Sequence, residues 1–409
     1  MASRVIKPDT FRFTLVLGLL AALPSLSIDI SAPTLLAVQQ QLLAPSGLVG
    51  LTITLFMFGF AFGQFGAGPL SDRYGRRPVL LIGLMGYSLA AIGCAVSATA
   101  EALVAWRLVQ GVAAGACAVL AFTMIRDLFE GDAARSKRSY VTVVFGLAPM
   151  LAPSLGAWIL GVAGWRPIYV IMSFAGVILL AAVMFGVAES RAEPTQGQKP
   201  PLIRNAYRRV LADRRFIGLA AVNALSFGAM FAYIAGSPIV LMGNLQLSAS
   251  NYGAFFACTA ASLTMGAWVS GRCASAGVGP RGLLWVSLVL AAASAVALAI
   301  LLAIDVGSVM LLFPLLLLNL FCRGMVAPNA QHMALEPMRE QAGTAAATVG
   351  VMQILTGALS SAFVAVLMPL MGPSGMTGVM AALALASLGL WLWVSLYSDP
   401  APVGAPVDA

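Results

Sequence analysis

Three charged side chains lie inside long apolar runs of this sequence, and they are the first candidates for chemistry. Asp29 is the one acidic residue well inside such a run, and Arg107 and Arg323 are the basic ones. Ionisable groups are costly in hydrocarbon, so those that occur there usually have a functional role. A carboxylate in this position can bind and release a proton, and an arginine can hold an anion. The sequence therefore predicts a proton site at Asp29.

Asp29 and Arg107 are expected to lie at a similar depth. At 1.5 Å per residue, Asp29 is about 10 Å and Arg107 about 8 Å below the same surface. If the first and fourth apolar runs adjoin, Arg107 can pair with Asp29, and proton affinity then depends on wetting and on bound cargo. The alternative is a permanent salt bridge that only fixes helix packing.

Two other apolar runs carry polar stripes at helical spacing. One run places Asn223, Tyr233 and Ser237 on one face, and a later run does the same with Gln353 and Ser360. Such faces either form hydrogen bonds between helices or line a wet wall that binds cargo. The sequence leaves both interpretations open.

Arg323, with Asn319 one turn before it, has no acidic partner in its own half of the chain. It either binds an anionic group or satisfies backbone carbonyls near Pro328. The predicted cargo-binding residues are Phe56, Asn223, Met230, Tyr233, Phe255, Phe256, Asn319, Arg323 and Gln353.

The elements that position these residues are membrane spans. With 60% hydrophobic and 9% charged residues among 409, the chain is far more apolar than a soluble globular protein. Runs long enough to cross a bilayer are expected at residues 13–36, 48–70, 78–98, 102–126, 139–163, 167–188, 216–243, 250–271, 281–303, 308–334, 343–370 and 375–397.

The basic residues predict the orientation. Of 23 Lys and Arg residues, 20 fall in the N-terminus and the loops after even-numbered spans, and only Arg166 falls in the opposite loops. This asymmetry predicts a multi-pass membrane protein with both termini in the cytoplasm. The net charge of +8 is spread over short clusters, so no nucleic-acid partner is expected.

A polar segment divides the spans into two sets of six. It contains three prolines and seven basic residues, and we expect part of it to lie on anionic lipid. The predicted units are an N-terminal six-helix bundle (1–188), a cytoplasmic linker (189–215) and a C-terminal six-helix bundle (216–409). This plan is typical of transporters with a central site between rocking halves.

Enzyme chemistry is not expected. The five cysteines lack C-x-x-C spacing, His332 has no ligand partner at i+4, and no Walker loop is present. We predict no metal, no cofactor and no ATP hydrolysis, and a monomer that handles a small molecule.

The loop G-P-L-S-D-R-Y-G-R-R-P, Gly68 to Pro78, resembles the signature loop of the major facilitator superfamily. R-L-V-Q-G from Arg107 and A-P-S-L-G-A, which contains Pro153 and Gly156, resemble the proton-coupling and antiporter motifs of its drug:proton antiporters, in particular the bicyclomycin-resistance (Bcr/CflA) branch. Asp29 matches the acid of the first span, whereas Ala21 stands where some relatives carry a second acid.

The resemblance implies an all-α membrane protein with the major facilitator fold, twelve transmembrane helices in two six-helix bundles. It also implies a location in the bacterial inner membrane and a conformational latch. In the outward-open state Asp72 would face the N-terminal end of the eleventh span, and Arg76 would pair with Asp127 and close the cytoplasmic side. The predicted latch residues are Gly68, Asp72, Arg73, Gly75, Arg76, Arg126 and Asp127.

The predicted function is proton-coupled efflux of amphipathic small molecules, including antibiotics, by alternating access. Asp29 and Arg107 would couple the proton. The alternatives are export of a native metabolite or sugar by the same machinery, and a membrane receptor that transports nothing.

Overall fold

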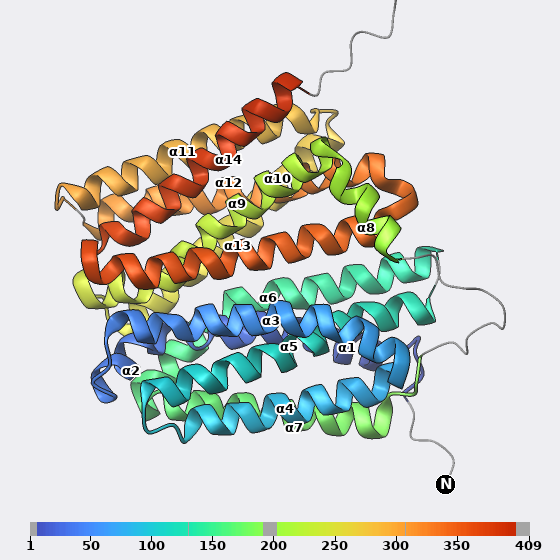
Figure 1. Cartoon of the computed structure of the whole chain (residues 1–409). Helices are drawn as coiled ribbons and strands as arrows, with labels where there is room; N and C mark the ends of the chain where they lie inside the picture. Colours follow the sequence, from blue (N-terminus) through green and yellow to red (C-terminus); the bar gives the residue numbers. More distant parts are fainter. Residues whose placement is uncertain (1–5, 130, 191–202, 307, 398–409) are drawn as a thin grey trace, which may run out of the picture.

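The computed structural model describes residues 6–129, 131–190, 203–306 and 308–397. In this part of the chain every regular element is helical, and the long helices run side by side along one direction (Figure 1). The twelve-span all-α fold predicted from the sequence is confirmed. Each predicted span falls on a long helix, with ends that differ by a few residues.

The first bundle holds six spans, of which the first is broken into three pieces. The pieces are α1 (Phe11–Asp29), η1 (Ala32–Thr34) and α2 (Leu35–Gln41), followed by α3 (Ser46–Tyr74), α4 (Arg76–Ala95), α5 (Ala100–Leu128), α6 (Gly131–Ala163) and α7 (Arg166–Gly186).

A short helix, α8 (Ile203–Ala212), precedes the second bundle. The spans of that bundle are α9 (Arg214–Ser237) with η2 (Pro238–Asn244), α10 (Ala249–Ser275), α11 (Pro280–Ala303), α12 (Val309–Leu335) with η3 (Glu336–Gln341), α13 (Ala342–Met371) and α14 (Ser374–Tyr397).

Length and composition suit a bilayer. Among the described residues, eleven helices are long and apolar enough to cross a membrane. The remaining span, α6, has 33 residues and a described apolar part at Leu151–Ala163. A helix of that length reaches roughly 50 Å at 1.5 Å per residue, so it also spans a hydrocarbon core of about 30 Å.

Polar side chains at the turns start several helices. The hydroxyl of Thr99 accepts from the amide of Ala102, and the carboxylate of Asp213 accepts from the amide of Phe216 at 2.8 Å. These side chains satisfy amides that the first helical turn leaves without partners. The chain is therefore set to begin a helix directly after each of these turns.

Small residues let helices of one bundle approach closely. Glycines of α3 and α5 face each other's backbone: a Cβ atom at Gly59, Gly63, Gly111 or Gly115 would come within 2.0–2.2 Å of a carbonyl oxygen on the other helix. Gly266 of α10 and Gly324 of α12 repeat the arrangement in the second bundle. Close backbone contact of this kind holds helices together where lipid removes the hydrophobic drive.

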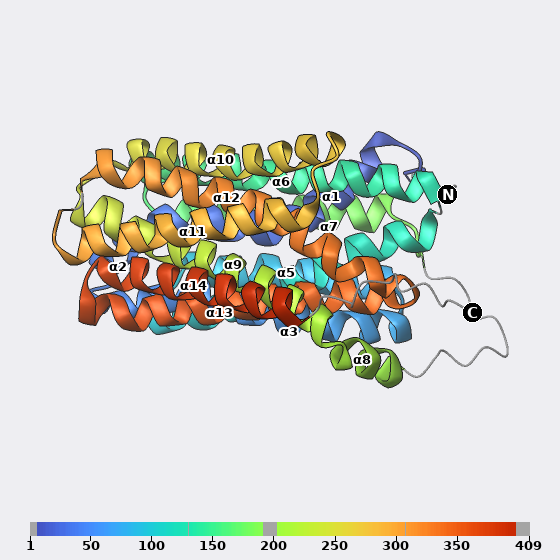
Figure 2. The ribbon, with the colours of Figure 1, turned by 90° about the horizontal axis from the view of Figure 1, so that it is seen from above.

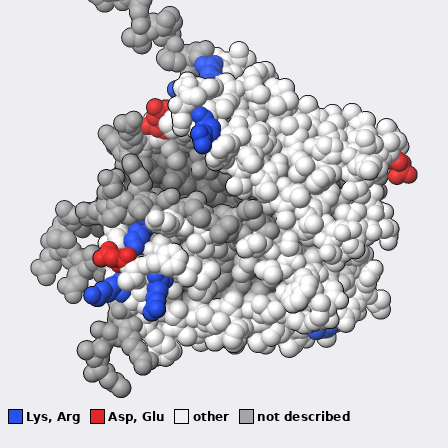
Figure 3. All heavy atoms as spheres, turned by 180° about the vertical axis from the view of Figure 1, so that it is seen from behind, with Lys and Arg blue, Asp and Glu red and all other residues white. Residues whose placement is uncertain are grey.

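The two ends of the molecule differ. The loop around Gly75 and helix α8 lie at one end, which we call the basic end, and α2 lies at the other, the far end (Figures 1 and 2). Figure 3 shows most charged side chains gathered at one end, where the surface between them is hollowed. The rest of the face seen in Figure 3 is broadly uncharged, as expected of a belt in contact with lipid.

The bundles touch through the half of the spans nearer the far end. The Thr54 hydroxyl of α3 donates to Ser361 of α13 at 2.9 Å, and the Ser154 hydroxyl of α6 donates to the carbonyl of Gly253 of α10 at 3.0 Å. Gly47 of α3 faces the Ala365 backbone of α13 so closely that a Cβ atom would stand 2.8 Å from its carbonyl oxygen. The molecule is thus held closed at its far end.

Candidate functional site

Asp29 lies where the first span is broken. It is the last residue of α1, and the backbone turns at Ile30 and Ser31 before η1 begins. Pro33, inside η1, cannot donate an amide hydrogen bond, which favours such an interruption. The side chain of Asp29 is 4% exposed, and it is the only acidic residue among the buried residues that the structure describes. A break places a carboxylate next to backbone groups that lack helical partners.

Gly156 of α6 packs directly on this break. A Cβ atom at that position would stand 2.1 Å from the carbonyl oxygen of Ile30 and 3.1 Å from Cγ of Pro33. Only glycine allows α6 to lie so close to the interrupted backbone. The motif that contains Pro153 and Gly156 therefore contacts Ile30, the residue that follows Asp29 in the sequence.

Arg107 of α5 reaches the same break but not the carboxylate. Its Nη1 donates to Oε1 of Gln110 at 2.8 Å, and its Nη2 donates to the carbonyl of Ser27 and the hydroxyl of Ser31 at 3.3 Å each. Among the described residues, no ion pair involves Asp29 or Arg107. The ion pair predicted between them is therefore wrong for this conformation, because the guanidinium bonds to groups on both sides of the break instead.

The surroundings of Arg107 are aromatic and closed. Its guanidinium carbon lies 4.2 Å from the ring centre of Phe56 and 5.8 Å from that of Tyr169, and the side chain is fully buried. Cation–π contact of this kind stabilises a guanidinium that has no acidic neighbour. Its Nε atom is buried without a hydrogen-bond partner.

The break in the first span faces the second bundle, because η1 lies beside both η2 and α10. In α10, the hydroxyl of the buried Tyr252 is 3.1 Å from the hydroxyl of Ser237, the last residue of α9. Ser237 directly precedes the π-helical turn η2. The breaks in the first and seventh spans therefore lie side by side.

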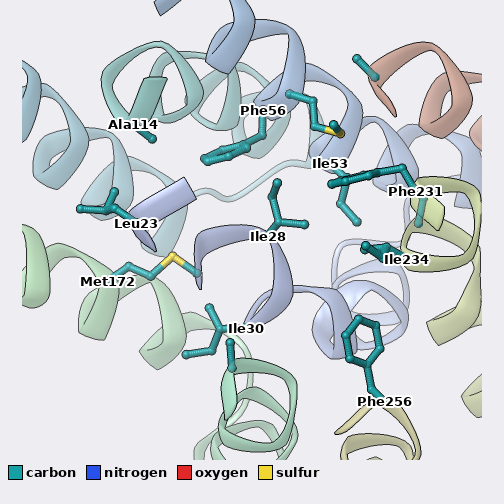
Figure 4. Close-up of a cluster of buried hydrophobic side chains, with 14 of the residues drawn as sticks. Leu23, Ile28, Ile30, Ile53, Phe56, Ala114, Met172, Phe231, Ile234 and Phe256 are labelled. Atoms are coloured by element: carbon teal, nitrogen blue, oxygen red, sulfur yellow. The ribbon is translucent and has the colours of Figure 1, made fainter. Parts of the chain in front are cut away.

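Apolar side chains from both bundles surround this place. Figure 4 shows Ile28, the neighbour of Asp29, close to Ile53 of α3 and facing Ile234 of α9, with Phe256 of α10 beyond. These residues belong to one buried cluster that includes members of both bundles. The break in the first span is thus surrounded by apolar side chains where the two bundles meet.

Comparison with known proteins agrees with this architecture. The family model of the major facilitator superfamily matches residues 17–361. The chain belongs to the major facilitator superfamily. It is 29% identical to a "Bicyclomycin resistance protein homolog" of Haemophilus influenzae, over 87% of this chain and 89% of the relative. It is 28% identical to "Multidrug resistance protein MdtL" of Escherichia coli, over 85% and 87% of the two chains.

Solved structures show the same fold at low sequence identity. A bacterial homologue of the human lysosomal transporter Spinster, inward-facing and occupied, has a TM-score of 0.79 at 15% identity, covering 97% of this chain and 99% of its own. A D-xylose-proton symporter has a TM-score of 0.75 at 17% identity, covering 93% and 97%. Members of this superfamily are transporters rather than enzymes, which confirms that part of the prediction.

The predicted aromatic cargo residues lie close together within α9 and α10. Tyr233 bonds through its hydroxyl to Thr259 at 3.0 Å and stacks on Phe256 with ring centres 5.6 Å apart. Phe255 packs against Phe313 of α12 at 4.5 Å. Tyr233, Phe255 and Phe256 are all buried in this conformation, and Phe56 is buried under Arg107.

The other predicted cargo residues differ in their surroundings. Met230 and Gln353 are half-buried, and Asn223 contacts Arg323. Asn319 donates instead to the carbonyl of Ala291 and the hydroxyl of Ser294, both on α11. Both of its amide hydrogens are used in this way. In this conformation the amide of Asn319 therefore joins α12 to α11, and its role in cargo binding stays a prediction.

The signature loop is bonded within the first bundle. Arg76 pairs with Asp127 of α5 at 2.9 Å and with Asp72 at 2.5 Å, and the side chain of Asp72 is 61% exposed. The pair of Arg76 with Asp127 is formed although the bundles close at the opposite end. The predicted Arg76–Asp127 pair therefore lies within one bundle in this conformation, and its role in closing the basic end in the outward-open state stays a prediction.

The other predicted latch residues lie at the same place. Arg73 lies over the ring of Tyr74 at 5.3 Å, and Gly75 has a φ of 98°. Gly68 is half-buried and Arg126 is exposed at the end of α5. The side-chain hydrogen bonds of Ser71 and Arg76 stay within the first bundle in this conformation.

Sequence reasoning missed Glu189 as a partner of this loop. Its carboxylate accepts from the amides of Arg76 and Arg77 at 2.9 and 3.1 Å, at the N-terminus of α4. A carboxylate is favoured there by the helix dipole. Its place directly after the sixth span, facing a basic loop, was the available signal. Tyr252 was also missed, since a tyrosine near the start of a span resembles an ordinary interfacial anchor.

Proposed function

We propose that this protein is a proton-coupled exporter of amphipathic small molecules, antibiotics included, and that Asp29 carries the coupled proton. The observation that supports this most is the position of Asp29: the one buried acid of the described chain stands at a break between two bundles. There it can meet water from one side or the other as the bundles move. A charge that only stabilises the fold does not have to lie at a boundary between moving bundles.

The geometry suggests a positioning role for Arg107 in this cycle. Its Nη2 atom bonds to Ser27 before the break and to Ser31 after it. It therefore holds the two parts of the first span in register while Asp29 stays free of a strong partner. A carboxylate without an ion pair binds and releases protons more readily than one locked to an arginine.

The cargo surface we propose is formed by aromatic and flexible side chains of α9, α10 and α13. Tyr233 and Phe256 offer stacked rings. Met230 and Gln353, which the sequence also predicts to bind cargo, are half-buried. Apolar contact with few polar anchors suits promiscuous binding. The names of the relatives, which refer to bicyclomycin and multidrug resistance, support this choice of cargo.

The proposed setting is the bacterial inner membrane, with the basic end and both termini in the cytoplasm. The two moving units are residues 1–188 and 216–409, joined by the linker 189–215. In this orientation the structure is the state closed toward the periplasm and open toward the cytoplasm. We propose that the protein acts as a monomer.

Transport in proteoliposomes tests the proposal. A pH gradient should drive accumulation of lipophilic drugs in vesicles that contain the protein, and addition of drug should drive proton release. Movement of a sugar but of no lipophilic drug would assign the protein to metabolite export. No cargo-driven proton movement with any compound of a broad panel would remove the transport function.

A further inference from the structure

The second bundle contains a buried cation that the proton site does not use. Arg323 of α12 is 6% exposed, and Asn223 of α9 beside it is fully buried. Nη1 of Arg323 donates to Oδ1 of Asn223 at 3.2 Å. No acidic residue of the described chain forms an ion pair with it. A buried guanidinium without a counter-charge is costly and needs an explanation.

Both side chains keep a donor without an acceptor. Nε of Arg323 and Nδ2 of Asn223 are buried, and neither has a hydrogen-bond partner. The two donors come from different helices and belong to side chains that already touch. Carboxylate oxygens accept from both kinds of donor, and arginine is the cation best suited to bind them.

The structure argues against a purely structural role for Arg323. The alternative predicted from the sequence was that Arg323 satisfies backbone carbonyls near Pro328. In the described chain its Nη1 atom donates to the side chain of Asn223 and not to a backbone carbonyl. Its other contact is aromatic, with the guanidinium carbon 5.5 Å from the ring centre of Phe227.

The aromatic side of this pair lies at the boundary between the bundles. Phe227 packs against Phe231 with ring centres 4.7 Å apart. A Cβ atom at Gly357 of α13 would stand 3.0 Å from the Phe227 ring and 2.6 Å from Cε of Met57, which belongs to the first bundle. Phe227 therefore connects the guanidinium of Arg323 with the boundary between the bundles.

We propose that Arg323 and Asn223 bind the anionic group of cargo, and that the exporter accepts amphipathic compounds that bear a carboxylate on an apolar ring system. This inference rests on the proposed export function and adds a cargo class to it. The carboxylate accepts from Arg323 and from the amide of Asn223, while the ring system lies along Phe227 and Phe231.

The test compares two probes of equal shape, 2-naphthoate and the uncharged 2-naphthamide, binding to the full-length protein in phosphatidylcholine nanodiscs at pH 7. The wild type should bind 2-naphthoate at least tenfold more tightly. Arg323→Gln should abolish this preference and keep the affinity for 2-naphthamide, which also reports that the variant is folded. Arg323→Lys should keep part of the preference, and Arg272→Gln, at an exposed arginine, should keep all of it.

Equal affinity of the wild type for the two probes, including no measurable binding of either, would overturn the proposal. So would an unchanged preference in Arg323→Gln. If phosphatidylglycerol in the nanodisc removes the preference, a lipid phosphate occupies these donors and the assignment to cargo is wrong.

Transport of a lipophilic cation separates this proposal from the function on which it rests. If the wild type and Arg323→Gln both export the cation under a pH gradient, the export function is supported. The binding data alone then decide whether the anion site exists. If the wild type moves no compound, the export function fails, whatever the nanodiscs show.

Discussion

Replacing Gly156 by alanine adds one methyl group where α6 lies on the break in the first span. Its carbon would stand 2.1 Å from the carbonyl oxygen of Ile30. Carbon and oxygen atoms in close favourable contact are about 3.3 Å apart or more, so the helix or the break must shift by roughly 1 Å. Overpacking of this kind costs about 1–3 kcal/mol.

A matched control separates this cost from the effect of alanine on the helix. Gly161 lies five residues further along α6, and nothing is within 4 Å of a Cβ atom there. Both substitutions gain roughly 0.5–1 kcal/mol because alanine favours the helix. The free energy of unfolding of Gly156→Ala should therefore be lower than that of Gly161→Ala by about 1–3 kcal/mol.

Thermal melting of the purified protein and drug export driven by a pH gradient measure the two consequences. Gly156→Ala should melt several degrees below Gly161→Ala and export more slowly, because the displaced break carries Asp29 with it. If the two variants melt together and export alike, α6 does not position the break, and the reasoning about Gly156 is refuted.

Two further perturbations test the machinery around the break and the far end. Arg107→Lys should slow export at least several-fold, since an ammonium group cannot bond to Gln110 and both sides of the break at once; export at the wild-type rate would show that only the charge matters. In a cysteine-free background, Thr54→Cys with Ser361→Cys should form a disulfide under oxidation, because the native hydroxyls are 2.9 Å apart, and it should stop export until reduced. Full crosslinking without loss of export would contradict movement of the bundles at this end.

The spans were predictable because their signal is summed over about twenty residues. Apolar length and the spacing of basic clusters gave each span, and the short motifs indicated the superfamily that the family comparison confirms. The break in the first span carried a local signal in Pro33. Its position directly after Asp29 came from the structure.

Contacts between side chains were less predictable, because sequence spacing gives depth and helix face but not the neighbour. Asp29 and Arg107 do lie in adjoining spans, yet the helix ends at Asp29 and the guanidinium reaches the backbone across the break. Asn319 was placed near Arg323 along the chain, but its amide points to α11. Nε of Arg323 and Nδ2 of Asn223 are free because neither has a hydrogen-bond acceptor among the described residues. No sequence pattern predicts that such a neighbour is absent.

Proton coupling through Asp29 is tested most directly by the cargo gradient that a fixed pH gradient supports. One pH unit corresponds to about 1.4 kcal/mol per proton, so one proton exchanged per uncharged cargo molecule allows a concentration ratio of about ten. With no membrane potential, the wild type in proteoliposomes should approach that ratio. Asp29→Asn, which keeps the shape of the side chain, should melt like the wild type and bring the cargo only to equal concentrations. A tenfold cargo gradient maintained by Asp29→Asn would contradict the account.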